Sequence, residues 1–136
     1  MIDAAALQAT LAELAADYTK RLDLRVEEAA PGRVRLTLPV TPELVHAGGV
    51  LCGQAILAAA DTAMLLAMIA QLGEFRPMTT VQLQASFVRP VPQDAGAVTV
   101  VATVLRFGRT LSYGEVGFHT PDGKLAAHAT TTYALV

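Results

Sequence analysis

The first apolar positions of the chain repeat with a helical period. Spacings of four, three and four residues separate Leu7, Leu11, Leu14 and Tyr18. This stripe predicts an amphipathic helix over residues 4–19 that buries one face. Asp3 before the helix and Lys20 after it carry the charges that the helix dipole favours at each end. We therefore expect residues 1–20 to form an N-terminal helix.

From residue 22 the apolar period changes to two. After a turn at residues 31–32, Val34, Leu36 and Leu38 alternate with polar side chains, which predicts a half-buried β-hairpin. Four more strand-like runs follow, at residues 78–88, 97–107, 111–119 and 124–135. In the first of these runs, the alternation predicts an apolar face made of Val81, Leu83, Ala85 and Phe87.

Residues 54–72 contain no Gly or Pro and are dominated by Ala, Leu and Met. Good helix formers without a polar face predict a long helix that must be buried all round. Its length also suits a membrane span, but Asp61 at its middle would cost about 3 kcal/mol inside a bilayer. A sheet can bury the helix instead. The pattern predicts an α+β fold in which an antiparallel sheet of five or six strands wraps around this central helix, plus the N-terminal helix.

Composition indicates one domain that associates with itself. A chain of 136 residues suffices for a single core, so we expect one domain over residues 1–136. Hydrophobic residues make up 53% and charged residues 16%, which excludes disorder and leaves more apolar surface than a small monomer usually hides. A homodimer or homotetramer is therefore expected.

Charge and cysteine content narrow the possible partners. The net charge of -2 does not provide the basic surface that a phosphate backbone requires, so no nucleic-acid partner is expected. A single Cys forms no internal disulfide, and the first 20 residues do not resemble a secretory signal, so we expect a cytoplasmic protein. His119 and His128 show no metal-ligand spacing and are expected at a surface or interface; no metal is predicted.

Asp61 is the only charged residue between Glu43 and Glu74. Its helical neighbours are Ala and Met, and burying a carboxylate without partners is costly. One interpretation is a structural carboxylate that is hydrogen-bonded across a subunit interface. The interpretation we favour is a general base or nucleophile, because enzymes place such groups in partly dry sites.

A glycine-rich loop leads directly into the same helix. Gly48, Gly49 and Gly53 allow close backbone approach where the first N–H groups of the helix lack partners, and such donors can stabilise the oxyanion of acyl transfer. Asp61 lies eight residues beyond Gly53, a rise of about 12 Å along a helix. One carbonyl cannot reach both, so a second, antiparallel copy of the helix in a two-fold dimer is needed to bring them together.

The stretch HAGGVLCGQAILAAADTAM resembles the signature of hotdog-fold acyl-CoA thioesterases, in the branch of the phenylacetate-degradation thioesterases and 4-hydroxybenzoyl-CoA thioesterase. The resemblance covers residues 20–135 and is supported by TTVQLQASFVRPV, LRFGRTLSYGEV and DGKLAAHATTTY. It implies that Asp61 is the catalytic acidic residue and that the Gly53 N–H polarises the thioester carbonyl. It also implies that Thr80 holds the attacking water against the carboxylate.

The chain departs from the family pattern at three positions. His46 stands where the family has an Asn or Gln that orients the substrate, and an imidazole can also donate a hydrogen bond. Cys52 and Gln54 replace a His and a Gly, and the Gln54 amide can supply a donor near the helix start. Cys52 could also act as a nucleophile with His46 as its base, but we favour a space-filling role beneath the loop.

Substrate contacts are expected at both polar and apolar residues. The resemblance places Arg89, Arg106 and Arg109 where contacts with coenzyme A phosphates are implied, although solvated arginines at strand ends have the same pattern. An adaptable apolar lining for the acyl group is expected from Met64, Met68, Leu44 and Phe87.

These observations predict an acyl-CoA thioesterase that hydrolyses an acyl or aryl-acyl thioester to a free acid and coenzyme A at a dimer interface. Coenzyme A is part of the substrate, so no separate cofactor is expected, and no membrane partner is expected. Two alternatives remain open: a hotdog enoyl-CoA hydratase or dehydratase, and a non-catalytic acyl-CoA-binding protein of the same fold.

Overall fold

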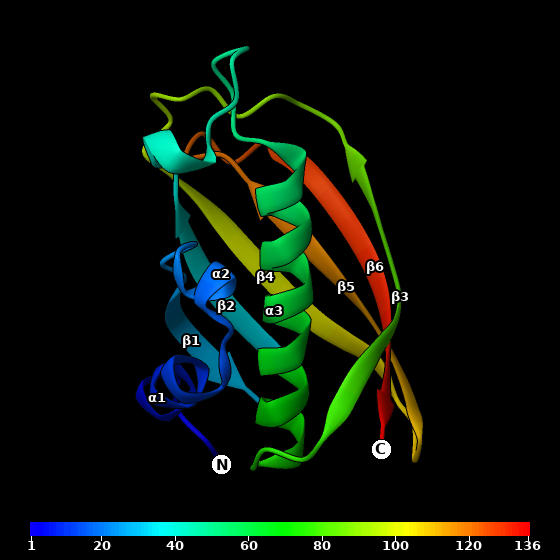
Figure 1. The fold of residues 1–136 in the computed structure, drawn as a ribbon. Coiled ribbons are helices and arrows are strands. Elements are labelled where there is room, and N and C mark those ends of the chain that lie inside the picture. Colours follow the sequence, from blue (N-terminus) through cyan, green and yellow to red (C-terminus); the bar gives the residue numbers. More distant parts are fainter.

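Six strands and one long helix dominate the computed structural model, which describes residues 1–136 (Figure 1). The helices are α1 (Ala4–Leu14), α2 (Asp17–Lys20) and α3 (Gly53–Leu72), with a short 3-10 turn, η1 (Pro42–Leu44). The strands are β1 (Arg25–Ala30), β2 (Arg33–Pro39), β3 (Met78–Phe87), β4 (Ala97–Phe107), β5 (Leu111–His119) and β6 (Leu125–Leu135). The predicted α+β class and its central helix are confirmed.

The strands form one antiparallel sheet in the order β1-β2-β4-β5-β6-β3. The sheet curves around α3, which runs along its concave face (Figure 1). On β2, the alternating positions Val34, Leu36 and Leu38 are at most 1% exposed, as the period of two predicts. The core therefore lies between this face of the sheet and α3.

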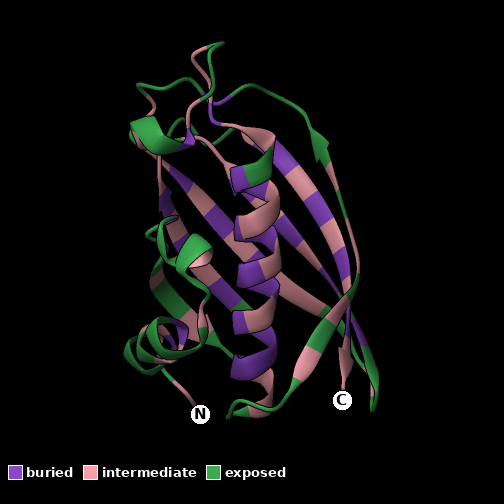
Figure 2. Ribbon diagram, viewed as in Figure 1, coloured by how far each residue is buried: buried purple, intermediate pink, exposed green.

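The sheet rather than a membrane covers α3. The helix is long and apolar enough to cross a bilayer by length and composition, but 67% of its most apolar window is buried inside the protein (Figure 2). The contact is close because Gly114 on β5 has no side chain; a Cβ there would lie 2.5 Å from Met64 Sδ. The helix ends at Gly73, whose φ of 81° is the left-handed conformation that favours glycine at a helix C-terminus.

One face of α3 remains only partly covered. Gln54 is exposed, and Ala58, Asp61 and Leu65 are half-buried. These four residues are spaced by four, three and four positions, so they form a single stripe along the helix. An apolar helix with an open stripe has surface left for a further packing partner.

The N-terminal segment differs from the single helix expected over residues 4–19. α1 ends at Leu14, because Ala15 and Ala16 adopt extended backbone conformations, and α2 follows as a separate short turn. Leu7 and Leu11 are buried as predicted. Leu14 and Tyr18 are 42% and 58% exposed, so the predicted stripe is wrong for its second half.

The two edges of the sheet differ in what lies beside them. At β1, the Gln8 side chain of α1 imitates a neighbouring strand: its Oε1 accepts from the Val26 N–H at 2.7 Å, and its Nε2 donates to the Leu24 carbonyl at 3.1 Å. At the other edge, β3 has no strand on its outer side. An open edge of this kind is a template for pairing with another chain.

A bulge in β3 decides which side chains face the helix. Thr80 pairs with Tyr133 and Gln82 with Thr132, so Val81 is an extra residue without a partner on β6. Val81 is 58% exposed, which corrects the apolar face expected from strict alternation. The shift leaves Thr80 on the side of the sheet that faces α3, where it contacts Asp61.

Candidate active site

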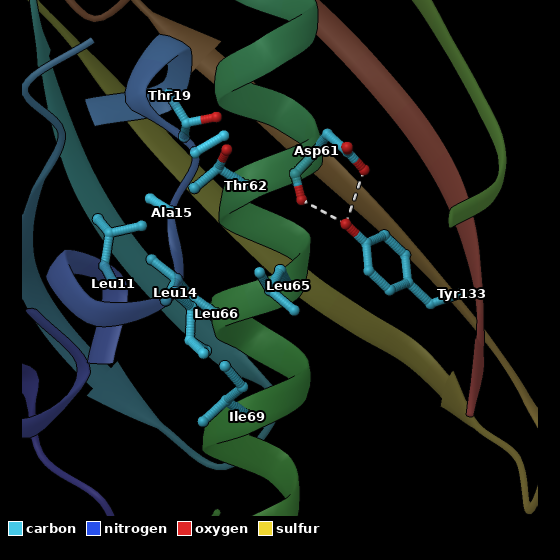
Figure 3. Close-up of a pocket in the computed structure, with 11 residues that line it drawn as sticks. Leu11, Leu14, Ala15, Thr19, Asp61, Thr62, Leu65, Leu66, Ile69 and Tyr133 are labelled. Carbon is cyan, nitrogen blue, oxygen red and sulfur yellow. Dashed lines mark hydrogen bonds between the residues drawn. The ribbon is translucent and has the colours of Figure 1, made fainter. Parts of the chain in front are cut away.

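The Asp61 carboxylate is held by two hydroxyl groups from the sheet. Thr80 Oγ1 on β3 donates a hydrogen bond to Asp61 Oδ1 at 2.7 Å. The Tyr133 hydroxyl on β6 lies 2.6 Å from the same Oδ1 and 2.7 Å from the Asp61 backbone carbonyl oxygen (Figure 3). Because Thr80 and Tyr133 are cross-strand partners, their hydroxyls reach one carboxylate oxygen together.

This arrangement leaves the two oxygens of Asp61 unequal. Oδ1 accepts from both hydroxyls, whereas Oδ2 makes no hydrogen bond within the chain. The lone pairs of Oδ2 are therefore the ones free to take a proton from water or to meet an electrophile. The side chain is half-buried on the partly covered stripe of α3, so it can be reached from outside this chain.

Tyr133 is a neutral donor at this site. Burial raises the pKa of its phenol well above the ordinary value, and the hydrogen bond to Asp61 raises this pKa further. Only 4% of the residue is exposed. A phenol that stays protonated supplies its O–H to Asp61 over the whole physiological range of pH.

Sequence reasoning assigned no role to Tyr133. The residue lies in the stretch DGKLAAHATTTY, which supported the family resemblance. Its contact with Asp61 spans 72 positions of the chain and depends on the register of β6 against β3. The one available signal for this contact was an aromatic residue with a hydroxyl group at a buried position of the last strand.

Because burial and the hydrogen bond to Asp61 raise the pKa of Tyr133, we expect its phenol to stay protonated at pH values where exposed phenols, with a pKa of about 10, ionise. Since only the unfolded chain then ionises this residue, the stability that it contributes falls as the pH rises above about 10. The absorbance rise at 295 nm between pH 8 and pH 11 should be equal in the native protein and in Tyr133→Phe. A rise smaller by one tyrosine in the variant would contradict this assignment.

A second group of donors lies at the start of α3. Cys52 is the N-cap residue but makes no side-chain cap, and the N–H groups of Gly53, Gln54 and Ala55 have no hydrogen-bond acceptor in the chain. These N–H groups and the positive end of the helix dipole can stabilise a developing negative charge.

Gly53 lines a cavity of about 380 Å³. His46, Phe87 and Arg89 also line it. A Cβ on residue 53 would lie 3.3 Å from Phe87 Cζ, so the absence of a side chain keeps the helix start accessible. This cavity brings together three of the predicted site residues, namely His46, Gly53 and Arg89.

His46 is oriented by its own loop. The Gly48 N–H donates to His46 Nδ1 at 2.8 Å, so the ring carries its proton on Nε2 when neutral. Nε2 is then a free donor, which is the property expected of a residue that replaces an amide. The Arg89 side chain is exposed and donates from Nη1 to the Leu125 carbonyl at 3.1 Å.

The remaining predicted residues lie apart from these two groups. Cys52 is half-buried beside Tyr18 and Ala55 in a different pocket, which agrees with a space-filling role. Gln54 is exposed on the open stripe of α3. Arg106 and Arg109 are exposed at the hairpin between β4 and β5, at the opposite end of the sheet from Gly53 (Figure 1).

The expected acyl lining is wrong for two residues. Met64 and Met68 are 0% exposed, because their side of α3 packs against the sheet. Leu44 is also buried and lies in the pocket beside Cys52, whereas Phe87 lines the cavity at Gly53.

Comparison with known proteins identifies the family. The sequence model of the thioesterase superfamily matches residues 48–127, which is more than half of the chain. The chain belongs to the thioesterase superfamily. This membership and the relatives named as esterases support a thioester hydrolase, as the sequence predicted.

One sequence relative agrees with this assignment, and two solved structures share the fold. A candidate esterase of Saccharolobus solfataricus is 34% identical over 110 residues, 81% of this chain and 76% of the relative. The PaaI protein of the E. coli phenylacetic acid degradation operon superposes with a TM-score of 0.84 at 19% identity, covering 98% of this chain and 93% of PaaI. A hypothetical thioesterase from Streptococcus pneumoniae, solved with coenzyme A, has a TM-score of 0.77 at 19% identity, covering 83% and 85%. The hotdog fold is confirmed.

Proposed function

We propose that this thioester hydrolase acts on acyl-coenzyme A and that its active site forms between two copies of the chain. The observation that carries the proposal is that the two chemical groups of the site lie too far apart within one chain to act on the same carbonyl. An oriented carboxylate with a free Oδ2 and a helix start with free N–H groups lie on one helix, eight residues apart. That separation is about 12 Å along the helix, too far for one carbonyl group.

Two surfaces support pairing with a second copy. β3 presents an open edge, and α3 presents a partly covered stripe that includes Asp61. A two-fold axis beside β3 pairs the two edges and sets the two helices antiparallel. The start of one helix then lies beside the middle of the other, and two identical sites result.

In the proposed mechanism, the Gly53 N–H of one copy donates to the thioester carbonyl oxygen. Asp61 Oδ2 of the other copy takes a proton from water, and the oxygen of that water attacks the carbonyl carbon. The tetrahedral intermediate collapses by breaking the carbon–sulfur bond. The products are the free acid and the thiol of coenzyme A, which receives the proton from Asp61.

The hydroxyls of Thr80 and Tyr133 act on Asp61 in this mechanism. By donating to Oδ1 they fix the direction of Oδ2. Thr80 keeps lone pairs that can accept from the attacking water. His46 Nε2 can donate to the substrate from the cavity that also contains Gly53.

We propose that Arg89, Arg106 and Arg109 bind the phosphates of coenzyme A. Arg89 shares a cavity with Gly53, and a guanidinium group pairs well with phosphate. Arg106 and Arg109 lie at the other end of the sheet, which is the end where an antiparallel second copy would place its own helix start. The coenzyme A found with the structural relative from Streptococcus pneumoniae supports this class of substrate.

Replacing Asp61 with Asn should lower kcat by at least about 10², the low end for the loss of a general base. Release of thiol from several acyl-coenzyme A thioesters measures the effect. Asp94→Asn is the matched control, because Asp94 is exposed and lies outside the site, and it should retain native rates. Unchanged hydrolysis by Asp61→Asn would remove Asp61 from the mechanism.

A pair of substitutions at Gly53 isolates its N–H group. Gly53→Pro removes this donor and suits the first helical position, and the extended Cys52 before it, with φ -73° and ψ 150°, tolerates a following proline. Gly53→Ala adds a comparable Cβ but keeps the N–H. We expect Gly53→Pro to lower kcat by about 10² to 10³ and Gly53→Ala to lower it much less. Equal losses would show that bulk beside Phe87, not the missing donor, impairs the enzyme.

A further inference from the structure

The loop before α3 folds into a tight turn at His46. The His46 N–H donates to the Val50 carbonyl at 3.1 Å, and the His46 carbonyl accepts from the Gly49 N–H at 2.9 Å. Gly49 has a φ of 79°, the left-handed conformation that glycine adopts readily in turns. The loop is also tied to the chain after β3, because the Gln93 N–H donates to the Gly49 carbonyl at 3.0 Å. The backbone that carries the imidazole ring is therefore fixed.

Gly48 holds the ring itself in two ways. Its N–H donates to His46 Nδ1 at 2.8 Å, and it has no side chain where the ring lies. A Cβ on residue 48 would be 2.6 Å from Cε1 and 3.0 Å from Nδ1 of His46, so any side chain there would displace the ring. The φ of Gly48 is not positive. This glycine therefore provides space for the ring rather than an unusual backbone conformation.

The hydrogen bond from Gly48 fits only a neutral ring. A neutral imidazole that accepts at Nδ1 carries its proton on Nε2. A protonated ring has an N–H on both nitrogens, so two donors would face each other across the 2.8 Å between Gly48 N and His46 Nδ1. Because His46 is exposed, the protonated ring can rotate away into water. Its Nε2 donor then leaves the position in which the loop held it.

No other charged group near the loop holds the ring. Arg89 is the one other charged residue that lines the same cavity. Asp94 is exposed on the segment tied to the loop after β3, and Glu43 of η1 forms an ion pair with Arg21. The Gly48 N–H is the one hydrogen-bond partner of the ring within the chain. No carboxylate is thus in place to hold an imidazolium in the orientation of the neutral ring.

We propose that Gly48 is a positioning residue that holds His46 as a neutral hydrogen-bond donor to the thioester, and that protonation of His46 in acid releases the ring and slows hydrolysis. The inference rests on the proposed function, because it requires a thioester in the cavity that His46 shares with Gly53. A general acid at His46 would have to be the imidazolium, which does not fit the Gly48 hydrogen bond. The leaving thiolate therefore receives its proton from Asp61.

The pH dependence of hydrolysis tests the proposal, with the titration of the His46 ring followed independently by NMR. The substrate is whichever thioester the native protein hydrolyses fastest in a series from acetyl- to dodecanoyl-coenzyme A. The native kcat/KM should fall at least about tenfold as His46 becomes protonated, the low end for losing a hydrogen bond to a developing charge. The midpoint of this fall should match the NMR titration.

Two variants isolate the contribution of His46. His46→Gln keeps a side-chain donor that does not titrate, so this fall should be absent. His119→Gln is the matched control, because His119 lies on β5 outside the cavity, and it should retain the fall. Any loss that comes from protonation of Asp61 is common to all of these proteins, so it does not affect the comparison.

Gly48→Ala tests the positioning role at a pH above the His46 titration. The added Cβ displaces the ring, so kcat/KM should fall at least about tenfold in the native background. In a His46→Ala background there is no ring to displace, and Gly48→Ala should change kcat/KM little. Equal losses in both backgrounds would show that Gly48 acts on something other than His46.

Two further results would overturn the proposal while hydrolysis itself continued. One is an acid-dependent fall in kcat/KM that persists unchanged in His46→Gln. The other is a neutral His46 ring whose nitrogen NMR signals place the proton on Nδ1 instead of Nε2. A native protein that released no thiol from any thioester of the series at any pH would instead refute the proposed function, and with it this inference.

Discussion

The carboxylate of Asp61 lies on an otherwise apolar helix, and two hydroxyls of the sheet hydrogen-bond to it. Both donors come from the β3–β6 pair, and the bulge at Val81 allows Thr80 to face α3. The contact ties α3 to the edge of the sheet and also fixes which carboxylate oxygen is free. Stability of the edge strand and orientation of the proposed base therefore depend on the same few atoms.

The apolar character of α3 has two consequences for function. Its buried side packs so closely on β5 that Met64 approaches the backbone of Gly114. Its other side carries the partly covered stripe that includes Asp61. One helix thus supplies core residues and the proposed base, and its N-terminus supplies the proposed oxyanion donors of a site shared with a second copy.

Much of the fold could be predicted from periodicity, because α3 and the inward positions of β2 follow simple patterns. The predictions were wrong where the chain departs from a period: at Ala15, where α1 ends, and at Val81, where β3 bulges. Asp61 and Gly53 could be selected from charge isolation, glycine placement and family resemblance. Tyr133 could not, because its contact with Asp61 depends on packing between segments that are distant in the sequence.

Subunit complementation tests the shared site most directly. Asp61→Asn and Gly53→Pro homodimers each contain a defect in every site, whereas a mixed dimer contains one site with both native groups. After unfolding and refolding together in equal amounts, the two inactive variants should recover about a quarter of the native rate, since half of the dimers then have one of two sites intact. Activity that stays at the level of the separate variants, in a sample shown to contain mixed dimers, would contradict a site built from two chains.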